Sequence, residues 1–220
     1  MIPVEAINEA SRRCLQRGIR ILQGFRLGPT DRAHISALLF HMEPGIGTHW
    51  LDIGCGFGEP ASLMQELRPD LLFTLVNNNN FQLDQVPPHL DAYRVDMHAM
   101  PFEDGAFDGA MFLYSLCHAN GLMDALWESA RVVRTGGRLF VFDYLRQHGD
   151  NARTQAVLGA NFFNREELRA ATRATGWQMN LVILPPSGND AVFRAAFGDI
   201  ELYEELFASL VPVIWTATRE

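Results

Sequence analysis

The sequence predicts an α/β protein with a doubly wound, mostly parallel seven-stranded sheet and an N-terminal helical cap. Two observations lead to this fold class. Segments of strand and helix character alternate from Thr48 to about residue 184, which is typical of a parallel sheet with helices on both faces. An apolar run that begins at Trp50 also leads directly into a cluster of three glycines, as expected where a buried strand turns sharply into a helix.

The first 45 residues are expected to form the helical cap over the open end of the sheet. Apolar residues recur at helical spacing over 4–23, with glutamates early and arginines late, which suits the helix macrodipole. Residues 24–29 are typical of a turn. A second helix is predicted over 31–43, and it ends before Pro44 because proline cannot continue a helix.

The core domain is expected to span 46–220, with a helical insertion at about 185–210. Apolar runs bounded by turn residues predict strands, and apolar residues spaced three and four apart predict helices. No repeat or linker marks a second independent domain. The predicted strands cover 48–53, 71–76, 91–95, 107–113, 138–144, 177–184 and 212–217, and the predicted helices cover 58–67, 81–86, 121–134, 164–175 and 190–209.

Composition restricts the classes of function. The formal net charge of -8 disfavours a nucleic-acid partner, because phosphate binding needs a basic face. The three cysteines, Cys14, Cys55 and Cys117, are too widely spaced to form a zinc site or a disulfide framework, so a reducing cytoplasm is expected. Neither a secretory signal segment nor a membrane-spanning apolar run is evident in the sequence.

The glycine cluster indicates a ligand-binding turn. Gly54, Gly56 and Gly58 follow the strand, and glycines allow both a sharp bend and close approach of a ligand to the backbone. A dinucleotide fingerprint would place its third glycine three residues after the second, so this spacing disfavours NAD. Position 59 is also a glutamate, which disfavours a pyrophosphate at that helix N-terminus. A glycine-rich turn that binds no ligand remains the alternative.

With Asp52 two residues before the first glycine, the stretch WLDIGCGFG resembles the cofactor loop of class I S-adenosylmethionine-dependent methyltransferases, which have a Rossmann-like fold. The resemblance implies that the loop binds the methionine part of S-adenosylmethionine. It also implies that the Asn77 region binds the ribose, and that Asp96 and Met97 contact the adenine. A polar turn that caps a helix is the alternative for the asparagines. The cofactor residues expected in this way are Asp52, Gly54, Cys55, Gly56, Gly58, Asn77, Asn78, Asn79, Gln82, Asp96, Met97 and Leu113.

Three further segments narrow the resemblance: GCGFGEPA at the loop, NNNNFQ at 77–82 and CHA at 117–119. Together they resemble the sterol C-methyltransferases and similar small-molecule C-methyltransferases, which show GCGxGGPxR-like, NNNxYQ-like and EATCHAP-like segments. This chain has Glu59 for a loop glycine, Ser62 for an arginine and Tyr114 for the glutamate of the third segment. The missing glutamate puts a sterol acceptor in doubt, and the short chain suggests a smaller one.

The expected reaction is therefore methyl transfer to an electron-rich carbon, with an isoprenoid alkene as acceptor. Aromatic faces stabilise the resulting carbocation, and a weak base removes a proton from it. The candidate catalytic residues are Tyr114, His118 and Glu59. The alternatives are O- or N-methylation of a small metabolite, with His118 as base, and a catalytically silent binding protein.

An N-terminal arginine stripe suggests that the acceptor carries a diphosphate. Arg13, Arg17 and Arg20 share one face of the first predicted helix, and Arg26 lies nearby. Guanidinium groups suit phosphate oxygens, although a solvated face is the simpler explanation of such a run. No protein metal site is expected, and whether Mg²⁺ accompanies a diphosphate stays open. A role in secondary metabolism and a homodimer are further expectations.

Overall fold

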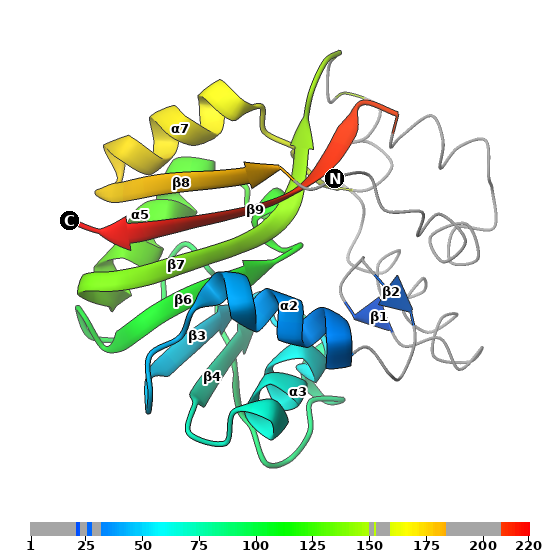
Figure 1. The fold of residues 1–220 in the computed structure, drawn as a ribbon, viewed down its shortest axis with the longest axis vertical. Coiled ribbons are helices and arrows are strands. Elements are labelled where there is room, and N and C mark those ends of the chain that lie inside the picture. Colours follow the sequence, from blue (N-terminus) through cyan, green and yellow to red (C-terminus); the bar gives the residue numbers. More distant parts are fainter. Residues whose placement is uncertain (1–20, 23–25, 28–31, 150–151, 153–158, 184–207) are drawn as a thin grey trace.

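The computed structural model describes residues 21–22, 26–27, 32–149, 152, 159–183 and 208–220 of the chain. Its elements alternate between strand and helix along most of that length (Figure 1). The strands are β1 (Ile21–Leu22), β2 (Arg26–Leu27), β3 (His49–Ile53), β4 (Leu72–Asn77), β5 (Asp91–Arg94), β6 (Phe107–Leu113), β7 (Val133–Arg146), β8 (Trp177–Ile183) and β9 (Leu210–Arg219). The helices are α2 (Arg32–Met42), α3 (Glu59–Leu67), α4 (Asn80–Leu83), the 3₁₀ turn η1 (Leu116–His118), α5 (Leu122–Val132) and α7 (Arg165–Ala174).

Seven strands form one sheet in the order β5-β4-β3-β6-β7-β9-β8. The five strands from β5 to β7 run parallel, and β9 is antiparallel to both of its neighbours. The strand order reverses between β3 and β6, so the carboxyl ends of these two strands mark the switch point at which ligands bind in open α/β sheets. The predicted fold class is confirmed.

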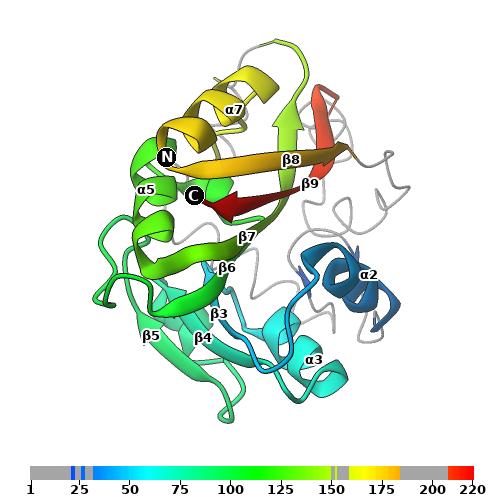
Figure 2. The same cartoon turned by 60° about the vertical axis from the view of Figure 1, so that its left-hand side comes forward.

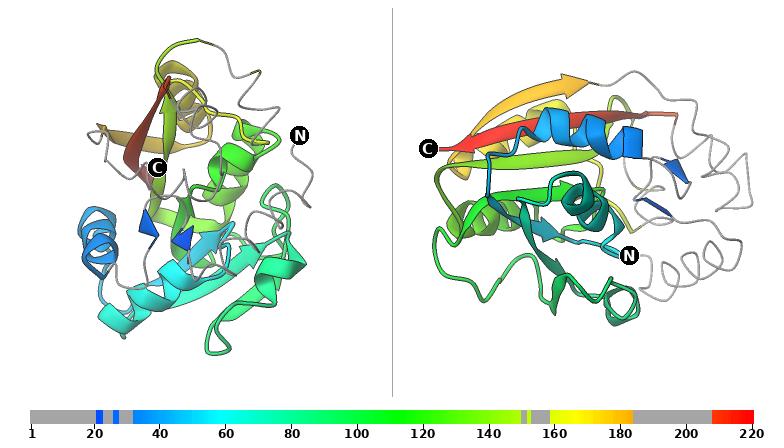
Figure 3. Two further views of the ribbon diagram at one scale, coloured as in Figure 1. Left: turned by 90° about the vertical axis from the view of Figure 1, so that its right-hand side faces the viewer. Right: turned by 60° about the horizontal axis from the view of Figure 1, so that its bottom comes forward.

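Helices cover both faces of the sheet (Figures 1 and 2). One face packs against α2 and α3 through a cluster of buried side chains that includes Ile35, Met42 and Met64. The other face packs against α5 and α7 through a second cluster, which includes Leu126 and Leu168. Figure 3 shows from two further sides that α2 and α3 lie together. The sheet is therefore buried between two apolar layers, as its near-continuous hydrophobic strands require.

Helix ends follow local sequence signals. Asn164 caps α7 by accepting from the backbone N–H groups of Glu166 and Glu167, and the Glu167 side chain returns a bond to the Asn164 backbone. This reciprocal capping satisfies N–H groups that the first helical turn leaves without partners. Helix α3 begins directly after Gly58, with Pro60 in its first turn, where a missing N–H group costs nothing.

Three expectations for secondary structure need correction. Ile21 and Leu22 pair with Arg26 and Leu27 as a small antiparallel ladder, so the first helix does not extend to residue 23 and the turn does not cover 26–27. Strand β7 begins at Val133, where β-branched residues and the glycines at 136 and 137 are poor helix formers. Most of 1–31 and all of 184–207 lie outside the described residues, so the cap and the insertion stay predictions. Residues 208 and 209, which the predicted helix included, form a turn.

Candidate functional site

The glycine loop joins β3 to α3 at the switch point of the sheet. Gly54, Gly56 and Gly58 all have positive φ angles, of 78°, 57° and 73°, a conformation that other residues rarely adopt. A Cβ on Gly54 would lie 2.4 Å from the Cβ of Ser115. The loop is tied to the end of β4, because the Gly54 N–H donates to the Val76 carbonyl at 2.8 Å. Backbone shape and packing therefore both require glycine here.

Asp52 lies on β3 just before this loop and is fully buried. Neither of its carboxylate oxygens has a hydrogen-bond partner among the described residues. Burial raises the pKa of this carboxyl from 3.8 to about 8, since the charged form loses its hydration. A buried carboxyl that lacks a donor fits the ammonium group of an amino-acid ligand, because that group would supply both a donor and a compensating charge.

The asparagine run at the end of β4 holds the loop from the other side. The Asn77 side-chain N–H₂ group donates to the Gly56 carbonyl at 3.4 Å and to Gln82 Oε1 at 2.9 Å. Its oxygen accepts from the Asn79 backbone at 3.2 Å. An aspartate could not donate these two bonds, so the amide explains why no acid stands at this position. Asn78 is exposed beside this buried group.

Two residues beyond β5, the chain forms the next edge of the site. Asp96 is exposed, whereas Met97 is half-buried and packs against the main core. The strand itself is joined to β4, because the Val95 N–H donates to the Asn77 carbonyl at 2.9 Å. The structure thus brings the three segments that were predicted to contact the cofactor to adjacent strand ends. Their roles in binding stay predictions.

Tyr114 follows β6 with a positive φ of 52°, which is strained for a bulky residue and often marks a functional position. Its ring centroid lies 4.7 Å from that of Phe142 and 5.3 Å from that of Tyr144. Tyr144 in turn packs edge-on against Phe162, with the centroids 6.1 Å apart. We call these four side chains the aromatic cluster. Burial raises the pKa of the Tyr114 hydroxyl well above its usual value, so it stays protonated.

An acid that the sequence analysis missed supports this cluster. Asp143 is buried on β7 and accepts from the Cys117 N–H at 3.0 Å and the Tyr144 N–H at 2.8 Å. Burial raises the pKa of its carboxyl to about 6, while the bonds from Tyr144 and Cys117 oppose the shift. The same surroundings raise the pKa of the Cys117 thiol, which makes that residue a packing group. The sequence signal that could have revealed Asp143 is an acidic residue near the carboxyl end of a predicted strand.

His118 ends the 3₁₀ turn that Asp143 anchors. Its Nδ1 lies 3.2 Å from the Gly159 carbonyl, which can only accept, so Nδ1 carries the proton and Nε2 keeps a lone pair. One side of the residue is exposed, yet the surrounding protein lowers the pKa of the ring. A neutral imidazole with an open nitrogen can act as a base.

Three further predicted residues lie within or directly beside the glycine loop or next to Tyr114. Glu59 is half-buried in the first turn of α3, and Leu113 and Cys55 are buried. Burial also raises the pKa of the Cys55 thiol. Arg13, Arg17 and Arg20 lie outside the described residues, as does the side chain of Arg26, whose backbone belongs to β2.

Comparison with known proteins identifies the family. A family model described as a methyltransferase domain matches residues 51–141, the stretch that contains the glycine loop, the asparagine run and Tyr114. This stretch is a methyltransferase domain of the class I S-adenosylmethionine-dependent type. The methyltransferase resemblance predicted from the sequence is confirmed, and so is S-adenosylmethionine as the cofactor.

The methyltransferase has sequence relatives of more than one kind. It is 31% identical over 135 residues to sterol 24-C-methyltransferase erg6 of Schizosaccharomyces pombe, with 57% of this chain and 35% of that enzyme covered. It is 30% identical over 121 residues to an O-methyltransferase of Pyrenophora dematioidea, with 51% and 45% covered. The chain thus spans less than half the length of these curated relatives.

Solved structures share the fold of the methyltransferase at low identity. Geranyl diphosphate C-methyltransferase of Streptomyces coelicolor A3(2) superposes with a TM-score of 0.73 at 18% identity, covering 86% of this chain and 79% of that one. The [4+2]-cyclase SpnF superposes with a TM-score of 0.79 at 20% identity, covering 97% and 94%. These likenesses show the fold alone.

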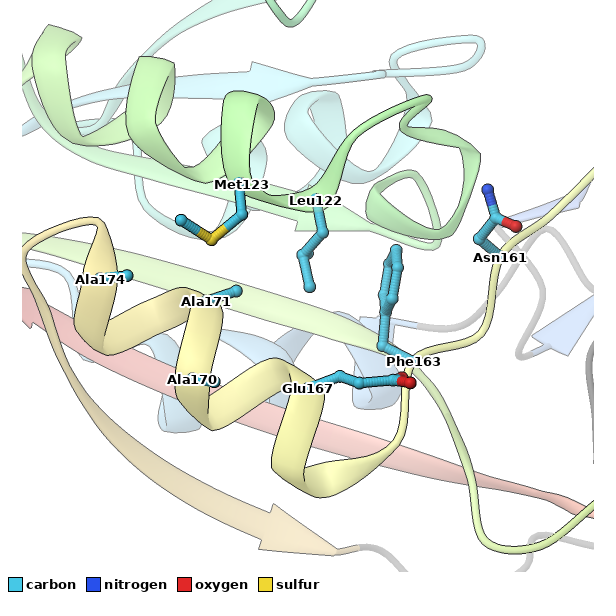
Figure 4. Close-up of a pocket in the computed structure, with 8 residues that line it drawn as sticks. All are labelled: Leu122, Met123, Asn161, Phe163, Glu167, Ala170, Ala171 and Ala174. Atoms are coloured by element: carbon cyan, nitrogen blue, oxygen red, sulfur yellow. The ribbon is translucent and has the colours of Figure 1, made fainter.

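A surface groove of the methyltransferase lies between α5 and α7 (Figure 4). Leu122 and Met123 of α5 face Ala170 and Ala171 of α7 across it, and Phe163 forms one wall. None of the predicted site residues lines it.

Two kinds of feature are absent from the described residues. They contain no group of three His, Cys, Asp or Glu side chains placed to bind a metal ion. The helices of this part of the chain are all too short or too polar to cross a bilayer.

Proposed function

We propose that this methyltransferase transfers a methyl group to a carbon of a small, largely apolar acceptor, and that the acceptor is an isoprenoid alkene. The aromatic cluster beside the glycine loop is the observation that carries the proposal. Ser115 packs against the loop at Gly54. Tyr114 is the residue before Ser115, so the aromatic cluster lies beside the predicted cofactor loop. A cofactor edge bordered by aromatic rings suits a reaction that develops positive charge on a hydrocarbon.

The residues present fit S-adenosylmethionine. Asp52 would pair with the amino group, the glycine loop admits close backbone approach, and Asp96 can accept from the adenine amine. When bound, the cofactor supplies an electrophilic methyl group with a good leaving group. The chain's main task is then to align an acceptor carbon with it, since alignment alone can supply much of the rate.

Methyl transfer to an alkene forms one C–C bond, breaks the S–C bond and leaves a carbocation on the more substituted acceptor carbon. The faces of Tyr114 and Tyr144 would stabilise this cation. Loss of a proton from a neighbouring carbon then restores an alkene. His118 Nε2 is our candidate base, because its lowered pKa keeps the ring neutral. Glu59 is the second candidate.

The sterol C-methyltransferase relative supports transfer to carbon. The diphosphate acceptor of the structural neighbour named above supports a prenyl diphosphate, and the N-terminal arginines would bind it. Because these arginines lie outside the described residues, their role in the proposal rests on the sequence pattern alone.

O-methylation is a second candidate function. The fungal O-methyltransferase is as similar in sequence as the sterol enzyme, and His118 could deprotonate a hydroxyl group instead of a carbocation. One structural neighbour is named as a [4+2]-cyclase. A third alternative is therefore a protein of this fold that binds its ligand without methyl transfer.

The experiment that separates these alternatives uses methyl-labelled S-adenosylmethionine with geranyl diphosphate, geraniol and a phenol. Carbon methylation of an isoprenoid supports the proposal. Label found only on oxygen would favour the second candidate. A protein that binds the cofactor but yields no S-adenosylhomocysteine with any acceptor would contradict both.

A further inference from the structure

Asp96, the predicted adenine residue, is held by a neighbouring histidine. His98 Nδ1 lies 2.6 Å from Asp96 Oδ1, and the His98 backbone N–H donates to the same oxygen at 2.9 Å. The two side chains differ in exposure, with 63% for Asp96 and 20% for His98. Within the described residues both bonds to this carboxylate end on Oδ1, which orients Oδ2 toward the outside.

A third contact fixes the proton on the His98 ring. The Gly121 N–H points at His98 Nε2 at 3.5 Å, and a backbone N–H can only approach a ring nitrogen that has a lone pair. The proton therefore sits on Nδ1 and is aimed at Asp96. The bonds from the His98 backbone and ring lower the pKa of the Asp96 carboxyl, so Asp96 remains an acceptor at neutral pH.

The surrounding chain holds this pair in place. Met97, between the two residues, packs against the main core. Gly121 is the N-cap residue directly before α5, and it follows closely on the turn that carries His118. His98 thus links the end of β5 to the start of α5. An exposed carboxylate would otherwise sample several rotamers, and the order imposed before binding reduces the entropy lost on binding.

We propose that His98 is a positioning residue of the adenine subsite, which orients Asp96 so that its Oδ2 accepts from the exocyclic amine of the base. The inference rests on the proposed cofactor function and adds a residue to it. It predicts selectivity for a 6-amino purine over a 6-oxo purine, because an oriented carboxylate meets a donor in the first and a repelling oxygen in the second.

The test compares two probes, S-adenosylhomocysteine and S-inosylhomocysteine, by calorimetry with wild type, His98→Ala, His98→Asn and His98→Gln. The alanine variant should bind S-adenosylhomocysteine roughly fivefold to tenfold more weakly, the effect of one hydrogen bond, with little change for the inosine analogue. Asparagine places an N–H₂ group where Nδ1 stands, so it should restore selectivity. Glutamine places that group one carbon farther out and should not.

Equal losses for both probes in His98→Ala would overturn the inference, because a structural role affects the two ligands alike. Unchanged selectivity in His98→Ala would overturn it as well. If alanine does not fold, the contrast between the asparagine and glutamine variants decides the question. A wild-type protein that binds neither probe would instead refute the proposed cofactor function.

Discussion

The buried Asp52 predicts that cofactor binding releases a proton. With a pKa of about 8, this carboxyl is almost entirely protonated at pH 6.5 before binding. An amino-acid ligand then places an ammonium group against it, and the pair is stable only with the carboxyl ionised. The α-amino group of the ligand is already charged at that pH. We therefore expect a net release of about 0.9 proton per cofactor bound at pH 6.5.

The assay is calorimetric titration with S-adenosylhomocysteine in buffers of different ionisation enthalpy. The slope of the observed enthalpy against the buffer enthalpy gives the number of protons exchanged. At pH 9 the carboxyl is largely ionised beforehand, so the same binding should release far less proton. Asp52→Asn is the matched control, because an amide of the same shape cannot ionise. Identical slopes for wild type and Asp52→Asn at pH 6.5 would refute the reasoning.

The same group makes stability depend on pH. The folded pKa of Asp52 is raised from 3.8 to about 8, so between these values the folded state binds more protons than the unfolded state. The free energy of unfolding therefore falls as pH rises from about 4 to about 8, by on the order of 5 kcal/mol for this carboxyl. In chemical denaturation, Asp52→Asn should flatten this part of the profile. A fall that persists unchanged in the variant would assign the pH dependence to other groups.

Three further predictions concern the loop and the aromatic cluster. Gly54→Ala should lower the unfolding free energy by about 1 to 3 kcal/mol, since its Cβ would lie 2.4 Å from that of Ser115; denaturation midpoints equal to wild type would contradict this packing. Tyr114→Phe keeps the ring, so it should change single-turnover methyl transfer much less than Tyr114→Leu, and equal losses would show that the hydroxyl matters and not the aromatic face. Asp143 has a pKa raised to about 6, so turnover should rise with pH through this value as its charged form anchors Cys117. A pH profile that is unchanged in Asp143→Asn would exclude that role.

Local patterns were enough to predict the fold and the cofactor loop. Each strand and helix depends on residues within one stretch of chain, and the glycine loop needs special backbone angles that glycine alone adopts easily. Strand β7 was longer than predicted and the ladder of β1 and β2 was missed, because pairing partners override weak local preference there.

The arrangement of side chains at the site was harder to predict. The Asn77 side chain donates its N–H₂ group to Gly56 and Gln82, and sequence spacing does not reveal its bond to the loop residue Gly56. Asp143 went unnoticed because its distant partner, Cys117, becomes its neighbour only when β6 and β7 pair. Residues from separate strands come together only in the folded sheet, so no single segment of the sequence predicts their contacts.

A crystal structure of the chain with S-adenosylhomocysteine bound would test the central claim most directly. We predict that the ligand lies across the carboxyl ends of β3, β4 and β5, with its amino group about 2.7 to 3.2 Å from an Asp52 oxygen. The exocyclic amine of its base should lie at the same range from Asp96. A ligand bound in the groove between α5 and α7, or one that leaves the Asp52 carboxyl without a donor, would contradict it.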